Sequence, residues 1–326
     1  KSLLWRAHIF RLLAAHDPLA HDHGRGPARV DEEANAELDH KGHHKHLRGF
    51  ELAQQQGLCK RGKGHDEHNP GAGAHRTFVE AGSQIIATAS YQCGQSQFES
   101  CGLTPAQARQ ALLDTTLIAR RAVAGTNTLV AASIGPFGAC LADGSEYTGR
   151  YDVEWSEIED YHRHKLNILV DSGADLIAVE TIPLADEARL IAEILQECGS
   201  PPAWFSFGFA DSALTYGGDT VAQAVTSVVG YDNLVGVGIN CTHPIYVEEL
   251  LLAMGQLAPT TDFVVYPNHG RAWDAIGRCW TGSSESIPST AELTRWVQLG
   301  AKFIGGCCGV GPDEIAELAR RSRHLD

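Results

Sequence analysis

The sequence predicts an α/β fold in which parallel strands close into an eight-stranded TIM-type barrel with helices outside. Short apolar runs without alternation recur along the chain, and a stretch with helical spacing follows most of them. Strands that are buried on both faces have this character. The alternative is a doubly wound open sheet, but no Gly-x-Gly-x-x-Gly motif opens a helix here. The pair Gly236 and Gly238 runs into Asn240-Cys241 and lacks the third glycine.

Composition narrows the class of protein and its partners. The chain has 326 residues, 43% of them hydrophobic, which is enough for a substantial core. Its net charge of −14 argues against a nucleic-acid or anionic-membrane surface, and no apolar run is long enough to span a bilayer. The opening residues 1–15 show no cleavage site, so we expect a cytoplasmic protein; a mitochondrial address is the weaker alternative.

Residues 1–76 differ from everything after them. They hold eleven of the sixteen histidines, with dense charge and glycine and no clear strand pattern. This composition is typical of a poorly ordered segment. A His-rich metal-binding arm and a misread reading frame are the alternatives. We therefore place the barrel domain at residues 77–326.

The barrel elements follow one another from residue 84. The first predicted strand is 84–88, and Thr104-Pro105 then opens a helix because threonine caps and proline suits the first turn. The further strands are expected at 128–134, 175–179, 203–207, 234–239, 263–265 and 301–304. Further helices are expected at 246–257, at 291–299, from Pro312, and over a stretch that carries Leu184, Ala188, Ile191 and Leu195 on one face. These are seven units, so the eighth strand is expected within the N-terminal segment.

Three of the nine cysteines fall at the carboxyl ends of two predicted strands. Cys241 follows the strand 234–239, and Cys307-Cys308 follow the strand 301–304. In a barrel of parallel strands these ends meet at one catalytic mouth. Three thiolates with an open fourth position suit zinc, and sulfur ligands select it over magnesium or calcium. A site of this kind accepts a substrate thiol and keeps it as the reactive thiolate, so no separate catalytic base is expected.

Each of these readings has a structural alternative. A buried cysteine is usually a small hydrophobic residue, and this is the interpretation for the other six. They are Cys59, Cys93, Cys101, Cys140, Cys198 and Cys279. His243 is a possible fourth ligand but is more simply an ordinary loop residue.

Four other residues at the predicted mouth are candidates for substrate binding. Glu180 ends a strand, where a carboxylate binds an ammonium group, acts as a base or is paired structurally. Asn240 and Asn268 are candidates to hydrogen-bond a carboxylate or to orient the metal ligands, and the alternative is that they cap turns. Tyr91 either lines the pocket or simply packs against neighbouring side chains.

Several ordered motifs stand at or near the predicted strand ends. They are Thr88-Ala89-Ser90-Tyr91-Gln92, Leu141 to Tyr147, Gly238-Ile239-Asn240-Cys241, Tyr266-Pro267-Asn268 and Gly305-Gly306-Cys307-Cys308. These motifs resemble the homocysteine S-methyltransferase family, in the branch that uses S-methylmethionine or S-adenosylmethionine rather than betaine. The resemblance runs from about residue 69 to the C-terminus and implies small-molecule partners.

The resemblance implies a (β/α)8 barrel with Zn2+ on Cys241, Cys307 and Cys308. It implies that the sulfur of homocysteine binds the zinc, that Glu180 binds its amino group, and that a sulfonium donor methylates it to methionine. Two alternatives are an inactive zinc-binding relative without a complete barrel and an enzyme that methylates another thiol or selenol, such as selenocysteine.

The chain departs from the family pattern at two places. The family's first strand ends in an Asp-Gly-Gly-type motif, for which Leu38-Asp39-His40-Lys41-Gly42 is a poor candidate. In addition, Gly309 stands where this branch often has arginine, which bears on the donor side of the site.

Overall fold

Eight parallel strands pair edge to edge into a closed ring in the computed structural model of the chain, which describes residues 11–14, 70–270, 272–274, 279–281, 287–323 and 325. In order around the ring they are β1 (Arg11–Ala14), β10 (Ala301–Gly306), β7 (Phe263–Tyr266), β6 (Leu234–Asn240), β5 (Ala203–Phe207), β4 (Leu176–Ile182), β3 (Leu129–Ile134) and β2 (Ile85–Ala87). The predicted α/β barrel is thereby confirmed.

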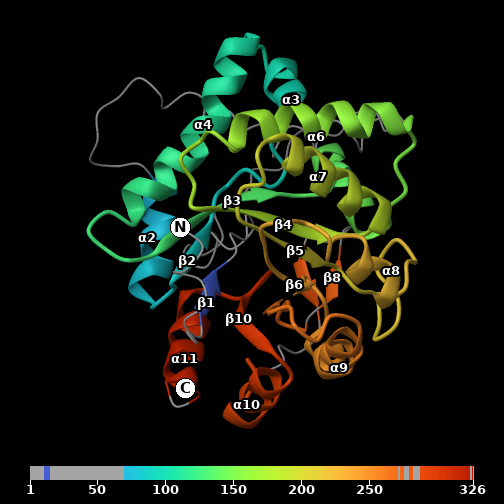
Figure 1. Ribbon diagram of the computed structural model, residues 1–326. Helices are drawn as coiled ribbons and strands as arrows, with labels where there is room; N and C mark the ends of the chain where they lie inside the picture. Colours follow the sequence, from blue (N-terminus) through green and yellow to red (C-terminus); the bar gives the residue numbers. More distant parts are fainter. Residues whose placement is uncertain are drawn as a thin grey trace, which may run out of the picture.

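Helices lie outside the ring and follow the strands in alternation (Figure 1). They are α2 (Pro70–Glu80), α3 (Gln95–Ser100), α4 (Pro105–Ala122), α5 (Phe137–Leu141), α6 (Trp155–Leu169), α7 (Ala185–Glu197), α8 (Val221–Thr226), α9 (Val247–Leu257), α10 (Thr290–Gln298) and α11 (Pro312–Ser322). Two 3-10 turns, η1 (Ser145–Tyr147) and η2 (Pro244–Tyr246), lie in loops, and β8 (Ala272–Asp274) pairs antiparallel with β9 (Cys279–Thr281). No helix within the described ranges is both long and apolar enough to cross a membrane.

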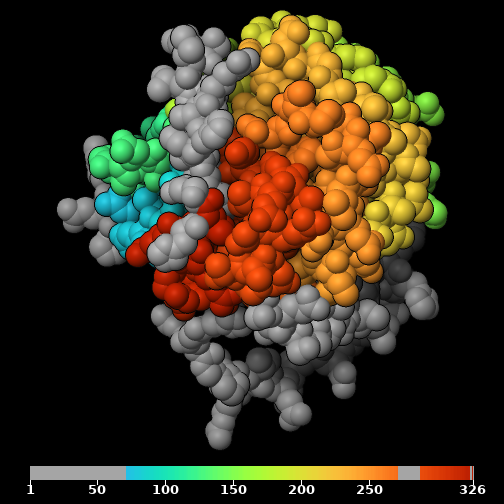
Figure 2. Space-filling view, turned by 60° about the horizontal axis from the view of Figure 1, so that its bottom comes forward, coloured from blue at the N-terminus to red at the C-terminus, as the bar shows by residue number. Residues whose placement is uncertain are grey.

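The strand that closes the ring lies in the N-terminal segment, as expected, although the sequence did not locate it. β1 pairs with β10 through Arg11 and Phe303 and with β2 through Leu13 and Ile85. Leu38-Asp39-His40-Lys41-Gly42 lies outside the described residues. Helix α2 begins at Pro70, before the boundary predicted at residue 77, which stays a prediction. Figure 2 shows the red C-terminal residues, which include α11, beside the cyan residues of α2.

Local sequence explains why several helices begin where they do. Thr104 and Ser289 each form a capping box, with Gln107 and Glu292 respectively, and thereby satisfy backbone N–H groups at the starts of α4 and α10. Short helices α3, α5 and α8 were not predicted, because five or six residues give too few turns for a helical period.

Two hydrophobic clusters divide the core between the faces of the sheet. Alternate strand residues such as Trp204, Val264 and Phe303 fill the inside of the barrel. Their neighbours along the same strands pack outward against the helices, together with Leu112 of α4 and Leu250 of α9. The inner cluster also contains Cys241 and Cys307, so the cysteines lie at one end of the barrel interior.

Candidate metal centre and active site

The three predicted cysteines meet in one cluster at the carboxyl ends of β6 and β10. The Sγ atoms of Cys241, Cys307 and Cys308 all lie within 4.8 Å of one another, and the first two residues are buried. Cys241 and Cys308 are 3.4 Å apart at sulfur. Sequence reasoning thus brought together residues that are 66 positions apart in the chain.

Cys241 and Cys307 are joined as a disulfide, whereas the sequence predicted reduced thiols. The ends of β6 and β10 place their Cα atoms 5.5 Å apart, which is the usual separation for a disulfide. A metal would need both residues as thiolates, so the metal-binding form is the reduced one. The same closeness of the strand ends permits either state.

The backbone around the cysteines is held in an uncommon conformation. Cys241 has a φ of 48°, in the left-handed region that few non-glycine residues adopt. Its carbonyl oxygen accepts hydrogen bonds from the Tyr216 hydroxyl at 2.9 Å and from Asn268 Nδ2 at 3.4 Å. Cys307 N donates to the Pro267 carbonyl at 2.9 Å. These contacts fix the directions in which the sulfur atoms point.

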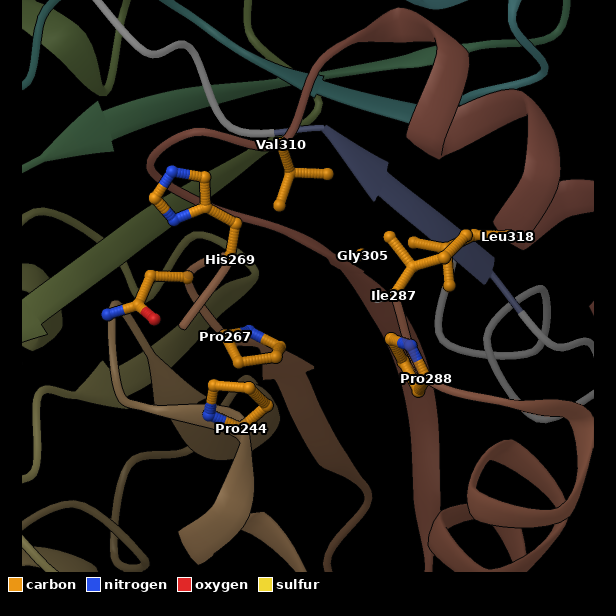
Figure 3. Close-up of a pocket in the computed structure, with 9 residues that line it drawn as sticks. Pro244, Pro267, His269, Ile287, Pro288, Gly305, Val310 and Leu318 are labelled. Atoms are coloured by element: carbon orange, nitrogen blue, oxygen red, sulfur yellow. The ribbon is translucent and has the colours of Figure 1, made fainter. Parts of the chain in front are cut away.

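Gly309, the position that departs from the family pattern, has a conformational reason to be glycine. Its φ is 78°, and a Cβ atom there would lie 2.2 Å from the ring of His269. Figure 3 shows His269 near Val310 and Pro267, and all three residues line a small cavity. The cavity measures about 20 Å³, enough for about one water molecule, so it offers no room for a substrate.

Glu180 lies inside the barrel, where both of its carboxylate oxygens accept hydrogen bonds. Ser133 Oγ donates to one oxygen, and the Tyr266 hydroxyl donates to the other at 2.9 Å. Burial raises the pKa of Glu180, while these two donors and Lys165 oppose that rise. The residue is within β4 rather than at its end, since the strand resumes at Ile182 after an irregularity in its pairing with β5.

That irregularity is held by Asn240. Thr181 has a φ of 60°, and its backbone N donates to Asn240 Oδ1 at 2.7 Å. Asn240 Nδ2 in turn donates to Thr181 Oγ1 at 2.6 Å and lies 3.9 Å from Cys307 Sγ. Asn240 therefore links the Glu180 strand to the cysteine cluster. Such bulges commonly re-aim a side chain near an active site.

Asn268 and His243 bond to loop residues that follow β6 and β7. Asn268 Oδ1 accepts from Gly270 N at 2.9 Å, and its backbone N donates to the Thr242 carbonyl at 3.1 Å. His243 Nδ1 accepts from Ile245 N at 3.3 Å at the start of η2. Among the residues that the structure describes, His243 does not join the three-cysteine cluster. Six other cysteines were interpreted as small hydrophobic residues. Of these, Cys93 is buried and Cys101, Cys140 and Cys198 are partly buried, and all four lie outside the three-cysteine cluster. Cys59 and the side chain of Cys279 lie outside the part of the chain that the structure describes.

Three tyrosines gather around the mouth. Burial, followed by the charge of Glu146, holds the pKa of Tyr91 well above its usual value, and Glu180 and Cys308 are close enough to add to the effect. The buried Tyr91 hydroxyl has no hydrogen-bond partner within the described ranges. The nearby side chain of Thr181 lowers the pKa of Tyr91 and so opposes part of the rise. Tyr147 and Tyr216 contact each other edge to face, with their ring centroids 5.3 Å apart.

The sequence did not single out Tyr147 and Tyr216 as site residues. The charge of Cys308 is the main influence that raises the pKa of Tyr147, so this ring lies beside the cysteines. The Tyr147 side chain remains 40% exposed. The Leu141–Tyr147 motif was a usable signal for this loop, whereas Tyr216 follows no strand and carries no pattern.

Lys165, a buried lysine on α6, holds the backbone of Tyr91 through a hydrogen bond. Its Nζ donates to the Tyr91 carbonyl at 2.8 Å and to the Tyr161 hydroxyl at 3.2 Å. Burial lowers the pKa of Lys165 to about 8. The backbone of Tyr91 is therefore held by an ammonium group that loses its proton more readily than an exposed lysine does.

The shifted pKa of Lys165 predicts how stability depends on pH. The unfolded chain keeps the lysine proton up to about pH 10.4, whereas the folded protein releases it near pH 8. Between these values the unfolded state binds more protons, so Lys165 makes the free energy of unfolding rise with pH. We expect the stability of the wild type relative to Lys165→Met to increase by about 3 kcal/mol from pH 7.5 to 10.5. Urea denaturation at each pH measures the free energy of unfolding, and Leu166→Met is the control. If the difference between the wild type and Lys165→Met did not change with pH, the prediction would be contradicted.

The chain is similar to known proteins both in sequence and in structure. Residues 69–322 match a family model described as homocysteine S-methyltransferase. The homocysteine S-methyltransferase of Escherichia coli is 38% identical over 260 residues, covering 76% of this chain and 83% of the relative. Crystal structures of the E. coli homocysteine methyltransferase superpose with a TM-score of 0.74 in the metallated form, at 31% identity over 99% of each chain. The oxidized form gives 0.73, at 30% identity over 98% of each.

Proposed function

The chain belongs to the homocysteine S-methyltransferase family, and we propose that it uses zinc to transfer a methyl group from a sulfonium donor to the thiol of homocysteine, giving methionine. The observation that carries the proposal is the convergence of three cysteine sulfurs, within 4.8 Å of one another, at the mouth of the barrel. S-methylmethionine and S-adenosylmethionine are the proposed donors. The reduced thiols that the site requires suit the cytoplasm, where we place the protein.

The donor set fits zinc. Three sulfur ligands at the ends of two strands match a tetrahedral site that keeps one position for substrate, and within the described residues no histidine or carboxylate joins them. When bound, zinc would hold the acceptor sulfur as a thiolate at neutral pH. Asn268 supports this centre by donating to the carbonyl of Cys241, and Asn240 supports it by holding the backbone of Thr181, next to Glu180.

Glu180 is proposed to bind the ammonium group of homocysteine. Its carboxylate is buried among the hydroxyls of Ser133 and Tyr266, and no arginine or lysine contacts it directly within the described residues. Those hydroxyls hold the carboxylate in place, while a cation of the substrate would offset its buried negative charge. Glu180 would then hold the amino group of homocysteine, while the cysteines hold the metal that binds its sulfur.

The tyrosines are proposed to receive the cationic donor. The faces of Tyr91, Tyr147 and Tyr216 attract a positive sulfonium centre, and the buried carboxylate of Glu146 adds negative charge nearby. In the transfer, the donor S–CH3 bond breaks with its electron pair going to the donor sulfur, and the homocysteine thiolate forms the new S–CH3 bond. The protein aligns the two sulfurs and excludes water from between them. No residue has to remove a proton during that step.

Metal analysis and a donor panel on one reduced preparation test the proposal. We expect about one zinc per chain and methionine formation from homocysteine with S-methylmethionine or S-adenosylmethionine, but not with betaine. A chelator should remove metal and activity together. Zinc binding without methionine formation from any donor would favour the inactive relative, although the closed barrel removes the structural reason for that alternative. Faster methylation of selenocysteine than of homocysteine would assign another acceptor.

A further inference from the structure

A buried carboxylate outside the barrel interior takes no part in the chemistry proposed above. Glu187 on α7 is completely buried, and it accepts hydrogen bonds from Phe137 N at 2.6 Å, His162 Nε2 at 2.7 Å and the Tyr151 hydroxyl at 2.8 Å. Because a carboxylate only accepts, the proton of His162 lies on Nε2. An apolar side chain would fill this space without the cost of burying a charge.

All three donors come from one stretch of chain, between β3 and the second turn of α6. Phe137 begins α5, directly after the end of β3, and Tyr151 lies just before α6. Their rings also pack together, with centroids 5.6 Å apart. Glu187 therefore ties down both ends of the segment 137–151, which carries η1 and Tyr147 between its two anchors.

A continuous set of contacts leads from this segment to the cysteine cluster. Gly138 leaves no space for a side chain, since a Cβ there would lie 2.5 Å from Glu146 N and 2.6 Å from the Tyr151 ring. Movement at Tyr151 is thus passed to the start of η1. Tyr147 packs on Tyr216, whose hydroxyl donates to the carbonyl of the metal ligand Cys241.

We propose that Glu187 is a positioning residue for the methyl donor, because it fixes the segment 137–151 and thereby holds Tyr147 against Tyr216 at the mouth. This inference rests on the proposed function, in which Tyr147 contacts the sulfonium donor. Glu187 touches neither substrate. Its effect on the reaction passes through Tyr147 and falls on the donor rather than on homocysteine.

Kinetics of a graded series of variants test the inference. Glu187→Leu removes all three hydrogen bonds and should raise the KM for the donor about tenfold or more, with the KM for homocysteine within about twofold of the wild type. Tyr151→Phe removes one hydrogen bond, so its KM for the donor should lie between those of the wild type and Glu187→Leu. Glu187→Gln should largely restore the wild-type value, because its amide oxygen accepts from Phe137 and His162 while its NH2 donates to Tyr151. Leu195→Ala, a buried change on the same helix, is the control for lost stability alone.

A double-variant comparison separates positioning from general loosening. In a Tyr147→Ala background, Glu187→Leu should add no more than about twofold to the donor KM, because the residue it acts through is gone. Equal effects in both backgrounds, or equal rises in the KM of both substrates, would overturn the inference.

A readout without catalysis distinguishes this inference from the proposed function. Chymotrypsin should cleave after Tyr147 faster in Glu187→Leu than in the wild type or in Leu195→Ala. If the wild type makes no methionine, the proposed function fails while proteolysis still reports on the segment. Unchanged cleavage together with an unchanged donor KM would show that Glu187 does not hold Tyr147.

Discussion

Cys307→Ser should lose bound zinc and methyl transfer together. A serine oxygen is a hard and weakly acidic ligand, so it holds zinc poorly where a thiolate held it well. Changing residues that merely contact a metal ligand typically costs roughly 10- to 100-fold, and loss of a ligand should exceed about 100-fold in activity. Cys307 also shares the buried cluster with Cys241, so no other described cysteine can take its place there.

The measurement is zinc content and activity on the same reduced samples. Reducing conditions are necessary because Cys241 and Cys307 otherwise pair with each other. Cys198→Ser is the matched control, since it changes a half-buried cysteine at the C-terminal end of α7 that is not part of the three-cysteine cluster. A Cys307→Ser protein that is free of metal yet fully active would refute the zinc mechanism.

Glu180→Gln should selectively weaken the binding of homocysteine. Glutamine keeps the size of the side chain but removes the charge that would pair with the substrate ammonium, and a buried charge-assisted contact of this kind accounts for about 2 kcal/mol, or roughly 30-fold. The amide oxygen can still accept a hydrogen bond from Ser133 or Tyr266. The effect should therefore appear in the KM for homocysteine, with the donor KM and zinc content preserved.

An acceptor without an amino group provides the sharper comparison. 4-Mercaptobutyrate has the thiol and carboxylate of homocysteine but no ammonium group, so the wild type should strongly prefer homocysteine. That preference should collapse in Glu180→Gln, while Ser133→Ala, which removes only one hydrogen-bond donor to the carboxylate, should keep most of it. If the variant lost stability but kept its preference, Glu180 would be a structural residue.

The sequence predicted the parts of the molecule whose patterns are local. Apolar strands that end in Asn240-Cys241 and Gly306-Cys307 identified both the barrel and the cysteine cluster, because parallel strands bring their carboxyl ends to one rim. The four-residue strand β1 escaped prediction because it is too short to show a period, and its pairing depends on the backbone of two distant strands.

Site residues whose contacts come from distant parts of the chain were harder to predict for a related reason. Ser133 lies within an apolar run and was read as part of a buried strand, yet its hydroxyl donates to Glu180 from the neighbouring strand. Tyr216 reaches the Cys241 carbonyl across 25 residues of chain. Contacts of this kind follow from the register of the sheet and from loop conformation, neither of which leaves a pattern along the sequence.

The way the barrel closes has a consequence for shortened forms of the protein. The stretch that matches the family begins at residue 69, but the strand between β10 and β2 comes from residues 11–14. A polypeptide trimmed to the matching stretch would leave the backbone N–H and C=O groups of both neighbours open along two facing edges. Exposed edges of this kind recruit strands from other molecules, so trimming would favour aggregation.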